Sequence, residues 1–134
     1  MLSEALFTST KQTWKTPRLL RQALDREFHF DFDPCPADPE FDGLNIAWGR
    51  TNFVNPPYNQ VEAWIRKSFA EFQDGKTVVI LVPARTDTKW FHEICLNYAT
   101  EIRFVPRRLR FDDHKDTAPF PSMLVIFDNK TKTL

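Results

Sequence analysis

The feature that most constrains the fold of this chain is the apolar run TVVILV at residues 77–82. A continuous run of aliphatic and β-branched residues is typical of a central strand that is buried on both faces of a parallel sheet. Apolar residues at helical spacing occur before it, at residues 17–27 and 60–73, and a third helix is expected after it, at residues 88–97, following the capping pair Thr86-Asp87. The run therefore predicts a sheet covered by helices.

Further segments read as strands that alternate with these helices. Residues 28–33 alternate strictly between apolar and polar side chains, and residues 51–54, 101–105 and 123–127 are short runs of strand-forming residues. Residues 109–111 are a further short candidate. The alternation predicts a three-layer α/β fold with a mostly parallel sheet and an antiparallel C-terminal strand.

The composition is that of one soluble domain. A chain of 134 residues is long enough for a core of its own, with residues 1–15 expected to form a loosely held arm. A formal net charge of zero argues against a pure nucleic-acid-binding module. No apolar stretch reaches the roughly 20 residues that span a bilayer, and no signal peptide is visible, so a cytoplasmic location is expected. The cysteines and histidines lack zinc spacing, and no metal is expected.

The motif that carries chemistry is Asn55-Pro56-Pro57-Tyr58, directly after the strand at residues 51–54. The two prolines fix φ and stiffen the turn. The Asn55 side-chain oxygen and the Pro56 carbonyl can then both accept hydrogen bonds from one exocyclic amino group. The ring of Tyr58 can stack on the same base. The alternative is an ordinary loop, because Asn-Pro and Pro-Pro are common loop dipeptides.

The position of this motif favours a binding site over a loop. In α/β sheets, ligands bind beyond the carboxyl ends of the parallel strands. Asp33-Pro34, the turn that begins at Asn55, and Pro83-Ala84-Arg85 all follow expected strands. We therefore expect three polar strand ends to gather on one edge of the sheet.

Taken together, the motifs resemble those of the phage-type DNA N-6-adenine methyltransferase (Dam) family over residues 8–128. In that family a Thr-Pro pair opens a helix ending in Glu-Phe-x-Phe, an aspartate ends the next strand, and a Trp-Ile-x-Lys helix follows the Asn-Pro-Pro-Tyr turn. The longest similar stretch is VILVPARTDTKWF at residues 79–91. The other matching positions are Thr16-Pro17, Glu27-Phe28-His29-Phe30, Phe32-Asp33-Pro34-Cys35, Asp42-Gly43-Leu44, Trp48, Trp64-Ile65-Arg66-Lys67 and residues 101–104 and 122–127.

The resemblance implies methyl transfer from S-adenosylmethionine to the exocyclic amino group of adenine in double-stranded DNA, with the adenine flipped out of the helix. It assigns catalysis to Asn55, Pro56, Pro57 and Tyr58. It also implies a phage or prophage enzyme in a bacterial cytoplasm, for which a restriction-modification role is compatible. Two other functions remain open: a non-catalytic nucleic-acid-binding relative of the same fold, and methylation of an amino group in cytosine, RNA or protein.

For the methyl donor, the resemblance implies a Rossmann-like methyltransferase core. Too few residues separate Asp33 from Thr51 for the two strand-helix units of a full methyltransferase, so the donor-binding half is expected to be shortened. Each candidate donor residue also has an ordinary alternative, as a helix start or as a turn or capping aspartate. The candidates are Thr16, Pro17, Asp33, Pro34 and Asp42.

DNA contacts are expected from basic residues beyond the strands. The candidates are Arg85, Arg107, Arg108, Arg110 and Lys115, and a solvated basic surface is the alternative. The chain has no separate target-recognition domain. Sequence specificity is therefore expected to be low, to come from the loop that carries these arginines, or to come from a partner subunit. The oligomeric state stays open.

Overall fold

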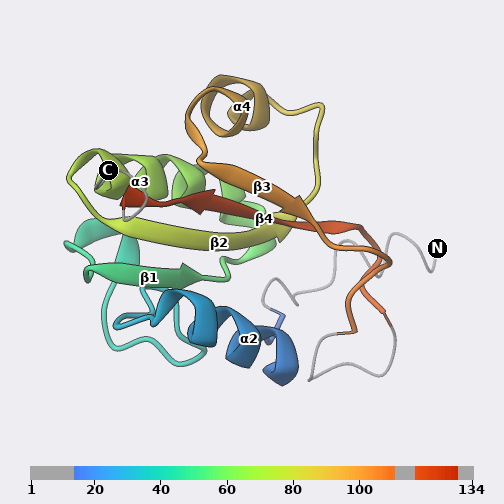
Figure 1. Ribbon diagram of the computed structural model, residues 1–134, viewed down its shortest axis with the longest axis horizontal. Coiled ribbons are helices and arrows are strands. Elements are labelled where there is room, and N and C mark those ends of the chain that lie inside the picture. Colours follow the sequence, from blue (N-terminus) through green and yellow to red (C-terminus); the bar gives the residue numbers. More distant parts are fainter. Residues whose placement is uncertain (1–13, 111–116, 130–134) are drawn as a thin grey trace.

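The computed structural model describes residues 14–110 and 117–129 (Figure 1). Most of the expected N-terminal arm, residues 1–13, lies outside the described residues, as does Lys115. The helices and strands are α2 (Arg18–Phe28), β1 (Thr51–Val54), α3 (Val61–Gln73), β2 (Thr77–Pro83), α4 (Leu96–Tyr98), β3 (Glu101–Phe104) and β4 (Ser122–Phe127). Two 3₁₀ turns at Gly43–Asn45 and Tyr58–Gln60 accompany them, and a π-helical turn at Phe91–Cys95 runs directly into α4.

The four strands form one sheet in the order β1-β2-β4-β3. β1 pairs parallel with β2, whereas β4 pairs antiparallel with both β2 and β3. β1, β2 and β3 therefore point in one direction and β4 in the other. The antiparallel C-terminal strand is confirmed, but by pairing the sheet is mixed rather than mostly parallel. The reason is the place of β4, which lies between β2 and β3 and so leaves β1 and β2 as the parallel pair of strands among the described residues.

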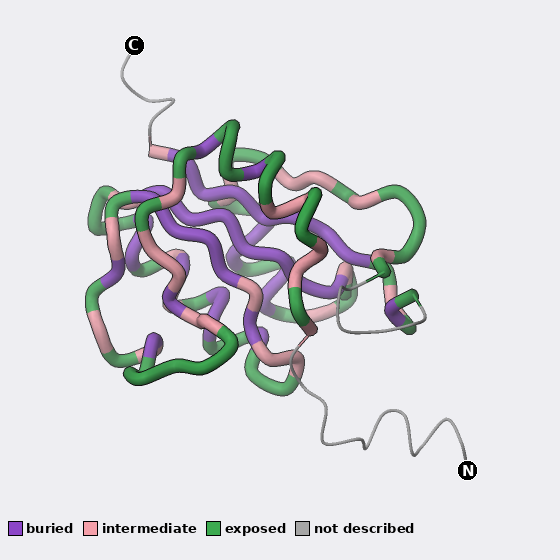
Figure 2. The backbone as a smooth tube through the Cα atoms, turned by 90° about the horizontal axis from the view of Figure 1, so that it is seen from below, coloured by how far each residue is buried: buried purple, intermediate pink, exposed green. Residues whose placement is uncertain are grey.

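β2 connects two hydrophobic cores. Successive strand residues point to opposite faces of a sheet. Val78, Ile80 and Val82 belong to the core beneath α3, and Val79 and Leu81 belong to the core beneath α2. Figure 1 shows α2 on one face of the sheet and α3 and α4 on the other, and Figure 2 shows the buried strands at the centre. The layered α/β arrangement expected from the sequence is confirmed.

The expected strand at residues 28–33 is not formed. α2 continues to Phe28, whose ring is buried, and ends at His29 in a left-handed conformation with φ 56°. The chain then runs beside β1 and makes a single parallel bridge, between Phe32 and Asn52. The alternating residues thus belong partly to a helix end and partly to an extended edge segment, a difference that the apolar pattern alone does not reveal.

The remaining elements lie close to their expected positions. The third helix differs at its start, because the Thr88 hydroxyl accepts a hydrogen bond from Phe91 N at 3.4 Å, in place of a cap by Thr86-Asp87. Residues 109 and 110 form no strand. Instead the Leu109 carbonyl accepts a hydrogen bond from Ala118 N at 2.7 Å, which closes the loop before β4.

A buried carboxylate fixes the loop that leads into β1. Glu71 of α3 accepts hydrogen bonds from Trp48 N at 2.8 Å, from Lys76 at 2.6 Å and from Lys67 at 3.1 Å. Burial by itself raises the pKa of Glu71, but the bonds from Lys76, Trp48 and Lys67 together outweigh it, and the net pKa is lowered. Glu71 therefore joins α3, the loop before β1 and the start of β2.

Replacement of Glu71 by glutamine should destabilise the fold in a pH-dependent way. We expect Glu71→Gln to lower the free energy of unfolding at pH 7 by about 1–3 kcal/mol, the cost of buried donors left without a charged acceptor. Because the folded pKa lies below the ordinary value of 4.5, the carboxylate contributes stability above that pH and loses it as the pH falls through the folded pKa. Urea unfolding at neutral and acidic pH should show the difference between wild type and variant shrinking in acid.

Glu62→Gln is the matched control on the same helix. Glu62 pairs with Arg66 at 2.9 Å on the exposed face of α3, where an ion pair contributes little. Equal losses in the two variants, or a loss at Glu71 that does not change with pH, would contradict the role assigned to the buried carboxylate.

Candidate active site

The polar turns of this fold gather where β1, β2 and β3 end and β4 begins (Figure 1). Asn55 directly follows β1, Arg85 follows β2, and Phe120 lies just before β4. A hydrogen bond from Ala84 N to Pro121 O, 2.9 Å long, holds the end of β2 against the start of β4. The strand ends that the sequence singled out at Asn55 and Arg85 therefore lie on one edge of the sheet.

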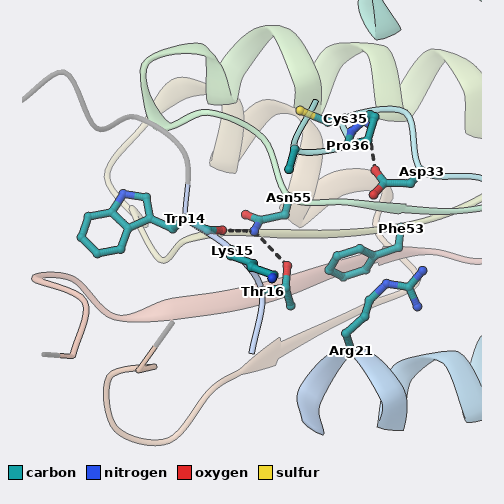
Figure 3. Close-up of a pocket in the computed structure, with 10 residues that line it drawn as sticks. Trp14, Lys15, Thr16, Arg21, Asp33, Cys35, Pro36, Phe53 and Asn55 are labelled. Carbon is teal, nitrogen blue, oxygen red and sulfur yellow. Dashed lines mark hydrogen bonds between the residues drawn. The ribbon is translucent and has the colours of Figure 1, made fainter. Parts of the chain in front are cut away.

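The side-chain amide of Asn55 is held by the segment that precedes α2. Its Nδ2 donates a hydrogen bond to the Thr16 hydroxyl at 2.9 Å and another to the backbone carbonyl of Trp14 (Figure 3). Its Oδ1 is buried and accepts no hydrogen bond from the residues that the structure describes. A buried acceptor without a donor is costly, and such groups are concentrated at functional sites.

A pocket of about 360 Å³ opens beside this amide (Figure 3). It brings together three residues that the sequence proposed for different tasks: Asn55 for catalysis, and Thr16 and Asp33 for the donor. Its volume falls within the range of small-molecule sites, roughly 300–1,000 Å³. Arg21, Cys35 and Phe53 are among the other residues that line it.

Asp33 combines a place in a turn with a place in the pocket. One of its carboxylate oxygens accepts a hydrogen bond from Cys35 N at 2.9 Å, which makes it a turn aspartate. The same side chain also lines the pocket (Figure 3). Burial raises the pKa of Asp33, and the Cys35 hydrogen bond and the positive charge of Arg21 act in the opposite direction. A cation bound beside this carboxylate would offset the cost of its burial.

The other residues of the turn are arranged around the aromatic ring of Tyr58. Pro56 is buried, and the Pro57 carbonyl accepts a hydrogen bond from Gln60 N at 3.0 Å, which closes the turn. The Tyr58 ring stacks against Trp14, with centroids 5.7 Å apart and an angle of 24° between the planes. Phe120 meets Tyr58 at 4.6 Å and 87°, in an edge-on arrangement.

Comparison with known proteins decides the family. Residues 4–133 match the family described as DNA N-6-adenine-methyltransferase (Dam). The chain belongs to this family. A DNA N-6-adenine-methyltransferase of Haemophilus phage HP1 is 30% identical over 142 residues, covering 91% of this chain and 82% of the relative. A DNA N-6-adenine-methyltransferase of Escherichia phage T1 is 26% identical over 117 residues, covering 78% of this chain and 49% of the relative.

The resemblance inferred from the sequence motifs is therefore confirmed, but the motifs did not point to Arg21, a charged residue that lines the pocket of this Dam-family chain. The Arg21 guanidinium lies 4.8 Å from the centroid of Phe30 and 4.9 Å from that of Phe53, and 3.4 Å from Asp25. Its position could have been predicted from helical spacing, because Arg21 lies three residues before the buried Leu24 and so on the side of α2 that faces the sheet. Arg21 thus lies next to the buried stripe of an amphipathic helix, with its side chain partly exposed.

Three of the proposed donor residues lie elsewhere. Asp42 is exposed and begins the 3₁₀ turn at Gly43–Asn45, where its side chain accepts a hydrogen bond from Leu44 N at 3.0 Å. The Pro34 carbonyl packs against Gly43 so closely that a Cβ there would lie 2.0 Å from it. Pro17 precedes α2 and faces a second, open cavity. None of these three is among the residues that line the pocket of about 360 Å³.

The basic residues proposed for DNA are all exposed where the structure describes them. Arg85, Arg107 and Arg108 follow the carboxyl ends of β2 and β3, and Arg110 shares the second cavity with Arg18. Arg103, within the same basic stretch, is bound to Glu27 at 2.6 Å and to Glu101 at 2.8 Å. It therefore serves to attach β3 to α2.

The described residues contain no group of histidine, cysteine, aspartate and glutamate side chains that could hold a metal ion. Within the same part of the chain, no helix has the length and apolar character needed to cross a membrane. Cys35 and Cys95 are both free thiols, and burial raises the pKa of Cys35 to about 11.

Proposed function

We propose that the chain transfers a methyl group from S-adenosylmethionine to the exocyclic amino group of adenine in DNA, with Asn55 holding that amino group. Membership of the Dam family makes it a DNA adenine methyltransferase. The observation that carries the site assignment is the buried Asn55 Oδ1, which has no donor among the described residues and lies beside a pocket of ligand size. Asn55, Pro56, Pro57 and Tyr58 form the acceptor side of the site, and the pocket forms the donor side.

The residues of the pocket fit the methionine end of the donor. That end carries an ammonium and a carboxylate, and the pocket is lined by one carboxylate, Asp33, and by two cationic side chains, Arg21 and Lys15. Asp33 would hold the ammonium, which also compensates for the burial that raises its pKa. Arg21, held over two aromatic rings, would hold the carboxylate. When bound, S-adenosylmethionine supplies a methyl group on a positively charged sulfur.

We infer that the fold is a shortened Rossmann-like methyltransferase core. Three strands of common direction, helices on both faces and a pocket at the carboxyl edge are features of that class. Between Asp33 and β1 the chain forms only a loop with one 3₁₀ turn. The two strand-helix units that would extend the donor half are therefore absent from this stretch.

On the acceptor side, the turn increases the nucleophilicity of the adenine amine. The lone pair of an exocyclic amino nitrogen is delocalised into the ring, so the nitrogen attacks poorly. Asn55 Oδ1 and the Pro56 carbonyl accept its two N–H bonds and shift electron density toward the nitrogen. Because Oδ1 is shielded from water, its dipole acts at low effective dielectric and needs no reorientation.

The flipped adenine takes the place of the Trp14 indole on Tyr58. The two rings stack at a centroid distance of 5.7 Å, which leaves no room for a third ring between them. An indole and a purine are both flat bicyclic rings, so a surface that accepts one also accepts the other. The indole can rotate away about its own side-chain bonds while the Trp14 backbone carbonyl stays on Asn55.

The DNA backbone would lie along the edge that carries Arg85, Arg107 and Arg108. These exposed arginines follow the strand ends that also position Asn55. Lys115, in the loop outside the described residues, and Arg110 would extend this surface. An enzyme that acts on DNA inside its host works in the bacterial cytoplasm, and the two phage relatives support that setting.

The central prediction is that the purified chain labels adenine in unmethylated DNA when given radiolabelled S-adenosylmethionine. Asn55→Ala should reduce the rate on the order of 10²–10³-fold, the cost of removing one preorganised hydrogen-bonding group from a transition state. Digestion to nucleosides identifies the methylated base. Label found in cytosine, or transferred to RNA or protein in preference to DNA, would show that adenine in DNA is not the substrate. Near-native turnover by Asn55→Ala would remove Asn55 from the mechanism.

Asp33→Asn should weaken donor binding by about 10–100-fold, because a charged hydrogen bond to a partly buried carboxylate contributes roughly 1.5–3 kcal/mol. Asp42→Asn is the matched control, since asparagine caps a helical turn about as well as aspartate and Asp42 does not line the pocket. Calorimetric titration with S-adenosylmethionine measures both. A larger loss at Asp42 than at Asp33 would place the donor away from this pocket.

Tyr58→Ala should weaken DNA-dependent turnover by a stacking energy of about 1–3 kcal/mol. Tyr58→Phe keeps the ring and should retain most of the activity. The measurement is kcat/KM for DNA in the two variants and the wild type. If kcat/KM falls equally in both variants, the Tyr58 hydroxyl and not the stacking face of its ring contributes to turnover.

A further inference from the structure

We propose that Thr16 is a positioning residue for Asn55: its hydroxyl, together with the Trp14 carbonyl, fixes the orientation of the Asn55 amide and leaves Oδ1 as the group offered to the substrate amine. The sequence placed Thr16 among the donor-binding residues. This inference rests on the proposed function and assigns Thr16 a different part in it.

The orientation of the amide follows from the chemistry of its neighbours. The oxygen and nitrogen of an asparagine side chain are told apart by their hydrogen-bond partners. A backbone carbonyl can only accept, so the atom of Asn55 that meets the Trp14 carbonyl must be the amino nitrogen. The same nitrogen lies 2.9 Å from the Thr16 hydroxyl, which therefore accepts its second N–H. Both donors of Nδ2 are thus occupied.

This arrangement determines which atom remains for the substrate. A free asparagine amide can rotate by half a turn and present either its donors or its acceptor. With both N–H groups bound to residues 14–16, rotation would bring Oδ1 against the Trp14 carbonyl, where two acceptors repel. Oδ1 therefore stays on the other side, buried and unbonded among the described residues. An adenine amino group needs an acceptor at this position.

Thr16 is itself held by the start of α2. Pro17 follows it with φ −56° and precedes the first residue of the helix, and the Pro17 carbonyl accepts a hydrogen bond from Arg21 N at 3.0 Å. A proline limits the conformations of the residue before it. The hydroxyl of Thr16 is therefore anchored to the helix that covers one face of the sheet, whereas Asn55 belongs to the end of β1. The hydrogen bond therefore joins the segment before α2 to the turn that follows β1.

Three variants test this assignment by activity and by binding. Thr16→Val keeps the shape of the side chain and removes the acceptor, so we expect kcat to fall about tenfold, with KM for DNA and the dissociation constant for S-adenosylmethionine within about twofold of wild type. Thr16→Ser restores the hydroxyl and should recover most of the lost kcat. Thr16→Ala removes both the hydroxyl and the methyl group and should match Thr16→Val. Urea unfolding shows that each variant is folded.

A second readout needs no activity. The side-chain NH₂ signals of Asn55, assigned by their loss in Asn55→Ala, are followed by NMR in the protein without DNA or donor. Thr16→Val should shift one of the two proton signals upfield and speed its exchange with water at least tenfold, and Thr16→Ser should leave both near their wild-type positions. Unmoved Asn55 signals in Thr16→Val would overturn the proposal.

The two readouts separate this inference from the proposed function. A tenfold loss of donor affinity in Thr16→Val with unchanged kcat and unmoved Asn55 signals would return Thr16 to the donor site and refute positioning. Wild-type protein that methylates no adenine, but whose Asn55 signals move in Thr16→Val, would refute the methyl-transfer assignment to this site while supporting Thr16 as the anchor of the amide.

Discussion

The rest of the structure depends on the burial of β2 on both faces. All seven of its residues are buried, and alternate side chains supply the core beneath α3 and the core beneath α2. Removing such a strand from water contributes more than any local propensity, at about 25 cal/mol for each Å² of apolar surface. β1 and β4 pair on either side of it, so the register along this one strand sets where β1 ends and where β4 begins at the site.

The site follows from that register. β1 and β2 are parallel, which brings Asn55 and Arg85 to the same edge, and β4 runs the other way, which brings Phe120 to that edge from the opposite direction. The Tyr58 ring therefore meets Phe120 although 62 positions separate them in the numbering. α2 covers the other core and carries Arg21 to the pocket. A single mixed sheet thus assembles residues from three distant segments.

Sequence reasoning could find those parts of the fold and site that are encoded within a few neighbouring residues. Local sequence patterns predicted three of these parts: the strand at residues 77–82, the helix at Val61–Gln73 and the turn that begins at Asn55. The pattern failed at residues 28–33, where the buried Phe28 ends a helix and does not begin a strand. It could not show that β4 lies between β2 and β3, because pairing order depends on long-range packing. It also missed Arg21, whose importance comes from the pocket that the fold builds around it.

If the donor half is shortened as we propose, residues 14–16 are what holds the Asn55 turn in place. A longer methyltransferase sheet could hold its asparagine turn with neighbouring strands and loops. Among the residues that the structure describes, β1 is instead an edge strand with only the Phe32 bridge beyond it. The turn that follows an edge strand has few backbone partners to fix it. Here the turn is held through its side chain instead, because Asn55 donates hydrogen bonds to the Trp14 carbonyl and the Thr16 hydroxyl. In the proposed mechanism, residues 14–16 therefore both line the donor pocket and orient Asn55 Oδ1 toward the adenine amine.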